Sequence, residues 1–238
     1  RLCTSSSEVD ALPAAEFDIN LFNDQWHDIV ASKVDGEFFT VRATPIQESL
    51  LSETMGTYNL YWSNHLFSLD KSVDVKRLKQ AWLALCQKNE ALRTGFIPVA
   101  EVNNSSRKDD LDFSILQVLH DHPTLDWEYV MCEDHEWDRL LHSRIEDVMK
   151  AHQKTYFKQP PWAVTVLDNG VERFMVLTMH HSIHDGPSLD LIERDLRSAY
   201  IDKPPSRYQL RSALSKILPT DEMAAETRRF WKLSQGRI

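Results

Sequence analysis

The sequence predicts an α/β protein in which a layer of strands packs against a layer of helices, as a two-layer sandwich. Strand-like and helix-like segments follow one another irregularly along the chain, and no segment repeats. The 238 residues are 42% hydrophobic, which is enough for one sizeable core or two small ones. One segment, Phe174 to Met179, is almost continuously apolar, as a central strand of a sheet is.

Residues 1–38 are expected to be a linker or an N-terminal arm. Polar and acidic residues there surround scattered aromatic side chains, of which Phe22 and Trp26 could dock on the rest of the protein. Ordered structure is predicted from residue 39 onward, so the domain is expected to comprise residues 39–238.

Local patterns predict the elements of this domain in order. A Thr-Pro-x-Gln capping box that begins at Thr44 predicts a helix start. Alternating large residues from Leu60 to Leu69 predict a strand, and Asp74 can cap the amphipathic helix that follows. An Asn169-Gly170 turn predicts two strands within "AVTVLDNGVERFMVLTMH". The other predicted elements are a strand over Phe113–Leu119 and helices over Trp137–Met149, Leu189–Tyr200 and Glu222–Leu233.

Composition argues against several classes of protein. A net charge of -9 and a pI near 5.6 lack the basic footprint of a nucleic-acid binder. Cys3, Cys86 and Cys132 are far apart, without the spacing of a zinc site or a disulfide framework, which indicates a reducing, cytoplasmic compartment. No apolar run is long enough for a membrane span. Because the chain starts at Arg1 without a leader, we expect it to be a piece of a longer protein.

The stretch "TMHHSIHDGPS" concentrates residues that carry chemistry. Three histidines and an aspartate at positions 180–185 are ligand types that zinc accepts. However, His180 and His181 are neighbours at the end of a strand, so their side chains should point to opposite faces, and we expect no metal. We expect His180 to be a satisfied core residue and His184 to be a loop residue near solvent.

Besides a metal site and a purely structural role, the cluster could perform acid–base catalysis. To act as a general base, a His181 imidazole that faces a cleft needs one fixed tautomer and one nitrogen near the hydrogen of a nucleophile. Gly186 would permit a tight turn, and the Asp185 carboxylate could lock that turn by pairing with a cation.

The same residues resemble a known family. "HHSIHDG" is similar to the HHxxxDG signature of the chloramphenicol-acetyltransferase-like superfamily, and within it "MHHSIHDGPS" most resembles condensation domains of nonribosomal peptide synthetases. "ATPIQESLL", "KNEALRTGF" and "RFWKLSQG" look like further stretches of that family, in the same order. The chain departs from the pattern at Lys88-Asn89, which replace an Arg-His pair, and at His184, where a smaller residue is common.

The resemblance implies a chloramphenicol-acetyltransferase-like fold with a mixed, mostly antiparallel sheet and helices packed on one face. Residues 39–238 would form the N-terminal lobe of a condensation domain and the start of the crossover to a C-terminal lobe that is missing.

Site residues follow from the resemblance position by position. His181 matches the histidine at which two carrier-bound substrates meet, and is the expected catalytic residue. His180, Asp185, Gly186 and Arg93 match structural positions. Arg93 is expected to pair with Asp185, so that Arg93→Ala damages folding rather than chemistry, and Gly186 is expected to let the pantetheine arm approach the backbone.

The implied reaction is amide formation between a donor acyl or peptidyl group and an acceptor aminoacyl group, both held as thioesters. No cofactor is expected to bind directly, because carrier (thiolation) domains upstream and downstream deliver the phosphopantetheine. The other implied partners are an adenylation domain and the missing C-terminal lobe, within a synthetase of the fungal siderophore type. The chain by itself is expected to be inactive, and no nucleic acid or membrane is expected as a partner.

Three alternatives stay open at this point. A free-standing trimeric acyltransferase that uses coenzyme A, like chloramphenicol acetyltransferase, has about this size. A non-catalytic lobe that binds carrier domains would keep the fold without the chemistry. An epimerase-type relative shares the first part of the histidine signature.

Overall fold

The computed structural model describes residues 16–102, 111–122 and 124–235. In these residues helices and strands follow one another irregularly, and two short 3₁₀ turns, η1 and η3, lie between them. In chain order the elements are α1 (Ile19–Ala31), β1 (Phe38–Arg42), α2 (Pro45–Gly56), β2 (Trp62–Ser68), α3 (Val75–Lys88), η1 (Ala91–Arg93), β3 (Thr94–Pro98), α4 (Val99–Val102), β4 (Ile115–His120), β5 (Trp127–Met131), η3 (Asp134–Glu136), α5 (Trp137–Lys154), β6 (Trp162–Asp168), β7 (Arg173–His180), α6 (Gly186–Tyr200), α7 (Leu210–Ile217) and α8 (Asp221–Gln235).

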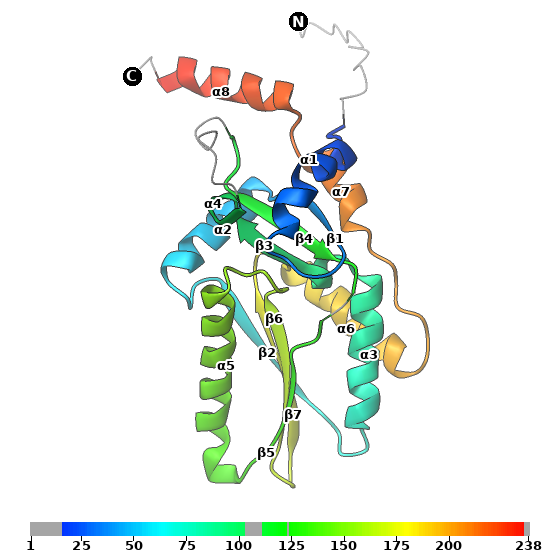
Figure 1. Ribbon diagram of the computed structural model, residues 1–238. Helices are drawn as coiled ribbons and strands as arrows, with labels where there is room; N and C mark the ends of the chain where they lie inside the picture. Colours follow the sequence, from blue (N-terminus) through cyan, green and yellow to red (C-terminus); the bar gives the residue numbers. More distant parts are fainter. Residues whose placement is uncertain (1–15, 103–110, 123, 236–238) are drawn as a thin grey trace, which may run out of the picture.

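The strands form two sheets, one above the other in Figure 1. The upper sheet has the order β1-β4-β3 and is antiparallel throughout. The lower sheet has the order β2-β7-β6-β5, and within it β5 and β6 alone are parallel. The prediction of an α/β fold with mixed, mostly antiparallel strands is therefore confirmed.

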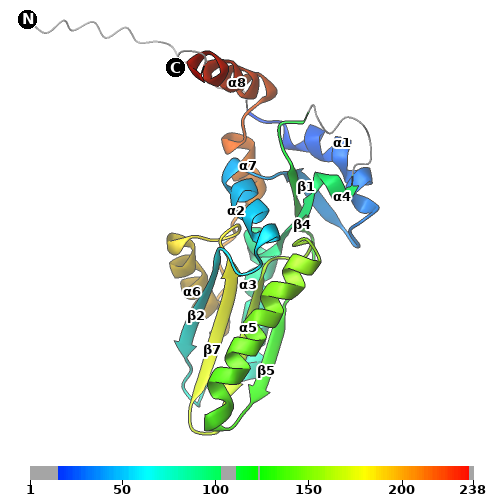
Figure 2. The ribbon, with the colours of Figure 1, turned by 90° about the vertical axis from the view of Figure 1, so that its left-hand side faces the viewer.

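Helices cover both faces of the lower sheet, which differs from the predicted two layers. On one face, Val164 and Met175 pack with residues of α3 and α6 in one apolar cluster. On the other face, Arg144 of α5 donates from Nε to Thr165 Oγ1 at 3.4 Å. Since Val164 and Thr165 are consecutive in β6, they point to opposite faces. Figure 2 shows α5 in front of the sheet, with α3 and α6 behind it.

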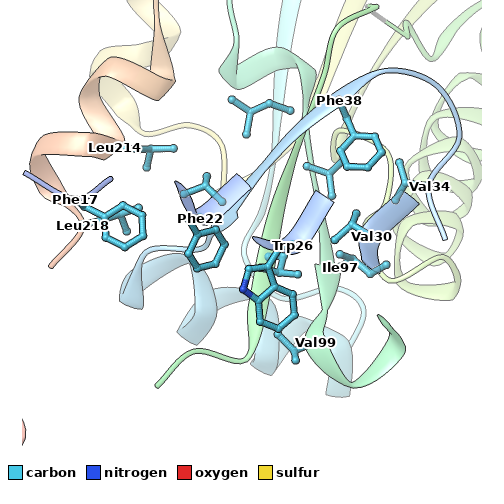
Figure 3. Close-up of a cluster of buried hydrophobic side chains, with 14 residues drawn as sticks. Phe17, Phe22, Trp26, Val30, Val34, Phe38, Ile97, Val99, Leu214 and Leu218 are labelled. Carbon is cyan, nitrogen blue, oxygen red and sulfur yellow. The ribbon is translucent and has the colours of Figure 1, made fainter. Parts of the chain in front are cut away.

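Part of the N-terminal segment belongs to the core: of the two expectations, a linker or an N-terminal arm, a linker does not fit residues 19–31. These residues form α1, whose N-cap Asp18 accepts hydrogen bonds from the first turn. One stripe of α1, made of Phe22, Trp26 and Val30, is buried against the upper sheet, as Figure 3 shows. The suggested docking of Phe22 and Trp26 is confirmed.

Most of the predicted elements form. The capping box at Thr44 starts α2, and Asp74 caps α3 through the backbone N–H groups of Lys76 and Arg77. The predicted Asn169-Gly170 turn joins β6 to β7, with Gly170 at a φ of 82°. The elements that local patterns did not predict are α1, β1, β3, α4, β5 and α7. Among the described residues, no helix is long and apolar enough to cross a lipid bilayer.

Gly95 in β3 allows another segment to cross the strand closely. A Cβ at this position would overlap with the carbonyl oxygen of Lys158, and the neighbouring Phe96 N–H donates to the Phe157 carbonyl at 2.7 Å. We predict that Gly95→Ala lowers the free energy of unfolding by about 1–3 kcal/mol or more, because the obstacle is backbone. Gly56→Ala is the matched control, since nothing lies within 4 Å of its Cβ position. Equal denaturation midpoints for the two variants would contradict the crossing.

Candidate functional site

The histidine cluster lies where β7 ends and α6 begins, at the border between the two sheets (Figure 1). His180 is the last residue of β7 and is fully buried, whereas the side chain of His181 is exposed. The backbone N–H of His181 donates to the Tyr61 carbonyl at 2.8 Å, which ties the strand end to the start of β2. The predicted opposite orientation of His180 and His181 is confirmed.

The His180 ring is fixed on both of its nitrogens. Nδ1 accepts from the backbone N–H of Ser182 at 3.1 Å, so the ring proton is on Nε2. Nε2 lies 2.8 Å from the buried hydroxyl of Thr54, which donates onward to the Leu50 carbonyl. Burial, together with the nearby histidines, lowers the pKa of His180 to about 3. His180 is thus a neutral structural residue, as expected for the core.

His184 is buried, which contradicts the expectation of a loop residue near solvent. It is 6% exposed, and its ring stacks on that of His181 with centroids 4.6 Å apart and planes 14° from parallel. Nδ1 lies 3.1 Å from the His180 carbonyl, and Nε2 lies 2.9 Å from the hydroxyl of Ser63. Burial lowers the pKa of His184 to about 4, so this ring is neutral at neutral pH.

Asp185 caps α6 instead of locking a turn through a cation. Its carboxylate accepts from the backbone N–H of Ser188 at 3.0 Å in a capping box, and the hydroxyl of Ser188 donates to it as well. These hydrogen bonds lower the pKa of Asp185. Gly186 and Pro187 then form the first turn, with Gly186 outside the left-handed region and open space at its Cβ position. The backbone of this chain therefore does not require glycine here.

The predicted pairing of Arg93 with Asp185 is wrong. The guanidinium of Arg93 donates from Nε to the Cys86 carbonyl at 3.1 Å, near the end of α3, and from a terminal nitrogen to the His120 carbonyl. Arg93 therefore joins the last turn of α3 to the end of β4 through hydrogen bonds to backbone carbonyl oxygens. A structural role remains, but its partners are backbone groups.

A double-mutant cycle tests this assignment. We predict that Arg93→Ala lowers the free energy of unfolding by about 2–3 kcal/mol, because charged hydrogen bonds to the carbonyls of Cys86, His120 and Asp121 are lost. Asp185→Ala should cost about 1 kcal/mol as the loss of a helix cap. The coupling between the two changes should be below about 0.5 kcal/mol, since they share no contact. A coupling of about 3–5 kcal/mol, as for a buried ion pair, would restore the pairing.

Several site residues were not predicted from the sequence. Gln47 accepts from the Thr44 N–H and donates from Nε2 to the Ser182 carbonyl at 3.0 Å, so the capping box of α2 also holds the histidine loop. Its position in the Thr-Pro-x-Gln pattern was the signal that could have indicated this contact. Ser63 and His65, both in β2, reach the histidine loop from the neighbouring strand. The alternation of side chains along β2 puts both on one face, and this was the signal that could have indicated their role.

No metal centre is evident in the described part of the chain, where no three His, Cys, Asp or Glu side chains are grouped as ligands. A hollow of about 660 Å³ lies between α3, α6 and the lower sheet, and is lined mainly by apolar side chains such as Leu78, Trp82 and Leu189. Neither His181 nor His184 lines this hollow. The exposed His181 ring therefore stands at a surface, with buried neutral imidazoles behind it, and can accept a proton from a group that approaches from outside.

Comparison with known proteins identifies a family. The family model described as "Condensation domain" matches residues 40–232. A nonribosomal peptide synthetase of Epichloe festucae, sidN, is 28% identical over 197 residues, which are 82% of this chain and 4% of that protein. A hydroxamate-type ferrichrome siderophore peptide synthetase of Schizosaccharomyces pombe is 35% identical over 162 residues, which are 68% of this chain and 3% of that protein.

Solved structures show the same fold. The condensation domain of the monacolin K polyketide synthase MokA superposes with a TM-score of 0.54 at 14% sequence identity. The superposed region is 85% of this chain and 41% of the MokA chain. The chain thus spans a few per cent of the length of these two synthetases and less than half of the condensation domain.

Proposed function

The chain belongs to the condensation-domain family, and on that premise we propose that residues 39–238 form the N-terminal lobe of a condensation domain in a nonribosomal peptide synthetase. The domain joins a donor acyl or peptidyl group to the amine of an acceptor aminoacyl group. The observation that carries the proposal is the exposed His181 imidazole, at the end of a central strand and next to the buried His180. The siderophore synthetases among the relatives support a fungal siderophore-type parent.

The reaction needs a proton acceptor at the acceptor amine. The amine nitrogen forms a bond to the donor carbonyl carbon, the carbon–sulfur bond breaks, and the donor pantetheine leaves as a thiolate. The proton released by the amine passes to His181 and from there to the thiolate, so the products are an amide and a free thiol. A general base of this kind contributes about 10²–10⁴-fold to the rate, and correct placement of the amine adds to it.

The geometry of His181 supports a site that is completed by another surface. Its ring is exposed, and it does not line the hollow between α3, α6 and the lower sheet. We therefore infer that a C-terminal lobe provides the opposite wall, and that carrier domains bring phosphopantetheine to the gap from both sides. An adenylation domain would supply the activated amino acid, and the widely spaced cysteines favour a cytoplasmic reaction.

A transfer assay with the full synthetase tests the reaction class. We expect mass spectrometry to find the condensed acyl-aminoacyl group on the acceptor carrier after both carriers are loaded, and no product with the chain alone. Carrier binding without transfer would favour the non-catalytic lobe, and inversion at the α-carbon without condensation would favour an epimerase. Transfer from acetyl coenzyme A by a trimer of this chain would contradict the proposal.

Gly186 offers a prediction about the pantetheine arm. Because nothing lies within 4 Å of its Cβ position, Gly186→Ala should change the free energy of unfolding by less than about 0.5 kcal/mol. If the arm approaches the start of α6, the added methyl group should lower condensation about tenfold. Steady-state rates of the synthetase check this. An unchanged rate would mean that the arm passes elsewhere.

A further inference from the structure

The ring of His181 touches one other ring in the described part of the chain, that of His184. No described side chain or carbonyl forms a hydrogen bond with the His181 imidazole. The hydrogen bond of this residue comes from its backbone N–H, which donates to the Tyr61 carbonyl. An exposed side chain with two free torsions samples several rotamers on a fast timescale. The parallel stack on His184 is therefore what restrains the plane of this ring.

His184 is itself held by a chain of hydrogen bonds that runs in one direction. Its Nδ1 faces the His180 carbonyl, which can accept but not donate, so Nδ1 carries the proton. Its Nε2 then accepts from the Ser63 hydroxyl at 2.9 Å, a shorter contact than the 3.3 Å from that hydroxyl to the Met179 carbonyl. With that hydrogen used, the same oxygen accepts from His65 Nε2 at 2.9 Å.

The chain of donors thus starts at the half-buried ring of His65 and ends inside the protein. Ser63 and His65 are two residues apart in β2, so both side chains leave the same face of the strand. They pair with Met179 and Leu177 of β7, which places them beside the strand that carries the histidine pair. His184 is thereby fixed by two elements that are distant in sequence.

The charges around His184 keep its ring neutral while His181 reacts. The groups that face it are His181, His65 and the His180 carbonyl, with the Asp185 carboxylate next in the chain. Burial dominates and lowers the pKa of His184 to about 4. If His181 takes the proton of the acceptor amine, its ring therefore meets no second positive ring at the centroid distance of 4.6 Å.

We propose that His184, held by Ser63 and by the His180 carbonyl, is a positioning residue that sets the plane of the His181 imidazole for attack by the acceptor amine. The inference rests on the proposed condensation function. A general base acts within about 2.6–3.2 Å of the proton that it removes, and misplacement by about 1 Å can cost on the order of 100-fold in rate. The role goes beyond the family signature, in which this position commonly holds a smaller residue.

Two substitutions at one position separate stacking from folding. His184→Leu and His184→Phe both lose the hydrogen bonds to Ser63 and to the His180 carbonyl, but His184→Phe keeps a flat ring. In the full synthetase we expect His184→Leu to lower kcat about 10- to 100-fold with KM for the carriers changed less than about twofold. His184→Phe should recover most of that loss. If His184→Leu and His184→Phe have equal unfolding temperatures and also equal kcat values, the proposal is overturned.

Nuclear magnetic resonance of the chain provides a readout that is independent of activity. The stacked ring should shift the C–H signals of His181 upfield, and the shift should disappear in His184→Leu and return in His184→Phe. If the His184 variants do not fold, Ser63→Ala serves instead: it keeps the His184 ring, releases Nε2 and should move the His181 signals and lower kcat a few-fold. Unchanged signals and kcat in Ser63→Ala would overturn the proposal.

His181→Ala, measured in parallel, distinguishes two kinds of failure. If His181→Ala is inactive while His184→Leu and His184→Phe have the same kcat, the positioning role is wrong and the condensation function stands. If His181→Ala keeps full turnover, the proposed function and the positioning role fall together, whatever the spectra show.

Discussion

His181→Ala is expected to lower the rate of amide formation about 10²–10⁴-fold in a synthetase that carries this chain. The imidazole at the exposed end of β7 is the group that we propose to take the amine proton, and the methyl side chain of alanine cannot replace it. Because the ring is exposed, we expect the free energy of unfolding to change by less than about 0.5 kcal/mol. Single-turnover transfer between loaded carriers measures the rate, and thermal denaturation checks the fold.

Two further variants sharpen this result. His181→Asn can donate and accept hydrogen bonds but cannot act as a base, so partial recovery relative to His181→Ala would assign positioning, and no recovery would assign proton transfer. His142→Ala is the control, because this histidine is exposed on α5, away from the cluster, and should leave transfer unchanged. Full turnover by His181→Ala would remove the residue from the mechanism.

The second large effect is a loss of stability in mild acid. Burial lowers the pKa of His180 to about 3 and that of His152 to about 4, both below the value of about 6.5 for an unfolded histidine. At a pH between these folded and unfolded pKa values, the two histidines bind protons in the unfolded chain but not in the folded chain. These two histidines therefore take up about two protons when the chain unfolds near pH 5, and together they lower the free energy of unfolding by about 2–3 kcal/mol for each pH unit between pH 6 and 4. His184 acts in the same direction.

His152→Phe tests the assignment, because the His152 ring packs against Trp62, at 5.6 Å, and Phe157, at 6.3 Å, where another flat ring can sit. We expect this variant to take up about one proton fewer on unfolding at pH 5 and to remain folded at lower pH. His142→Gln on the same helix is the matched control. Denaturation curves from pH 7 to pH 4 measure both, and an unfolding free energy that stays constant from pH 7 to 5 would contradict the buried neutral histidines.

Elements with strong local signals could be predicted from the sequence. The capping box at Thr44 and the cap at Asp74 each specify a helix start within a few residues, and the Asn169-Gly170 turn specifies a hairpin. The helix α1 carried a signal too, since Phe22 and Trp26 are one helical turn apart, but polar neighbours obscured it. The strand β5 is a partly exposed edge strand, and its pairing with β6 depends on residues far along the chain.

The site was predictable as far as side chains define it. His181 and the buried His180 follow from strand alternation, which is a local property. The partners of Arg93 are the carbonyls of Cys86, His120 and Asp121, and backbone groups leave no trace in a residue pattern. The burial of His184 depends on Ser63 of β2, so it appears only when the two strands are placed side by side.

The distance between the His181 ring and the acceptor amine is the most direct measure of the central claim. It can be obtained from a structure of the complete domain in which the acceptor carrier bears a stable amide analogue of the aminoacyl thioester. We predict that the amine lies within about 3.2 Å of a His181 ring nitrogen. An amine held by other side chains, out of reach of His181, would contradict the account.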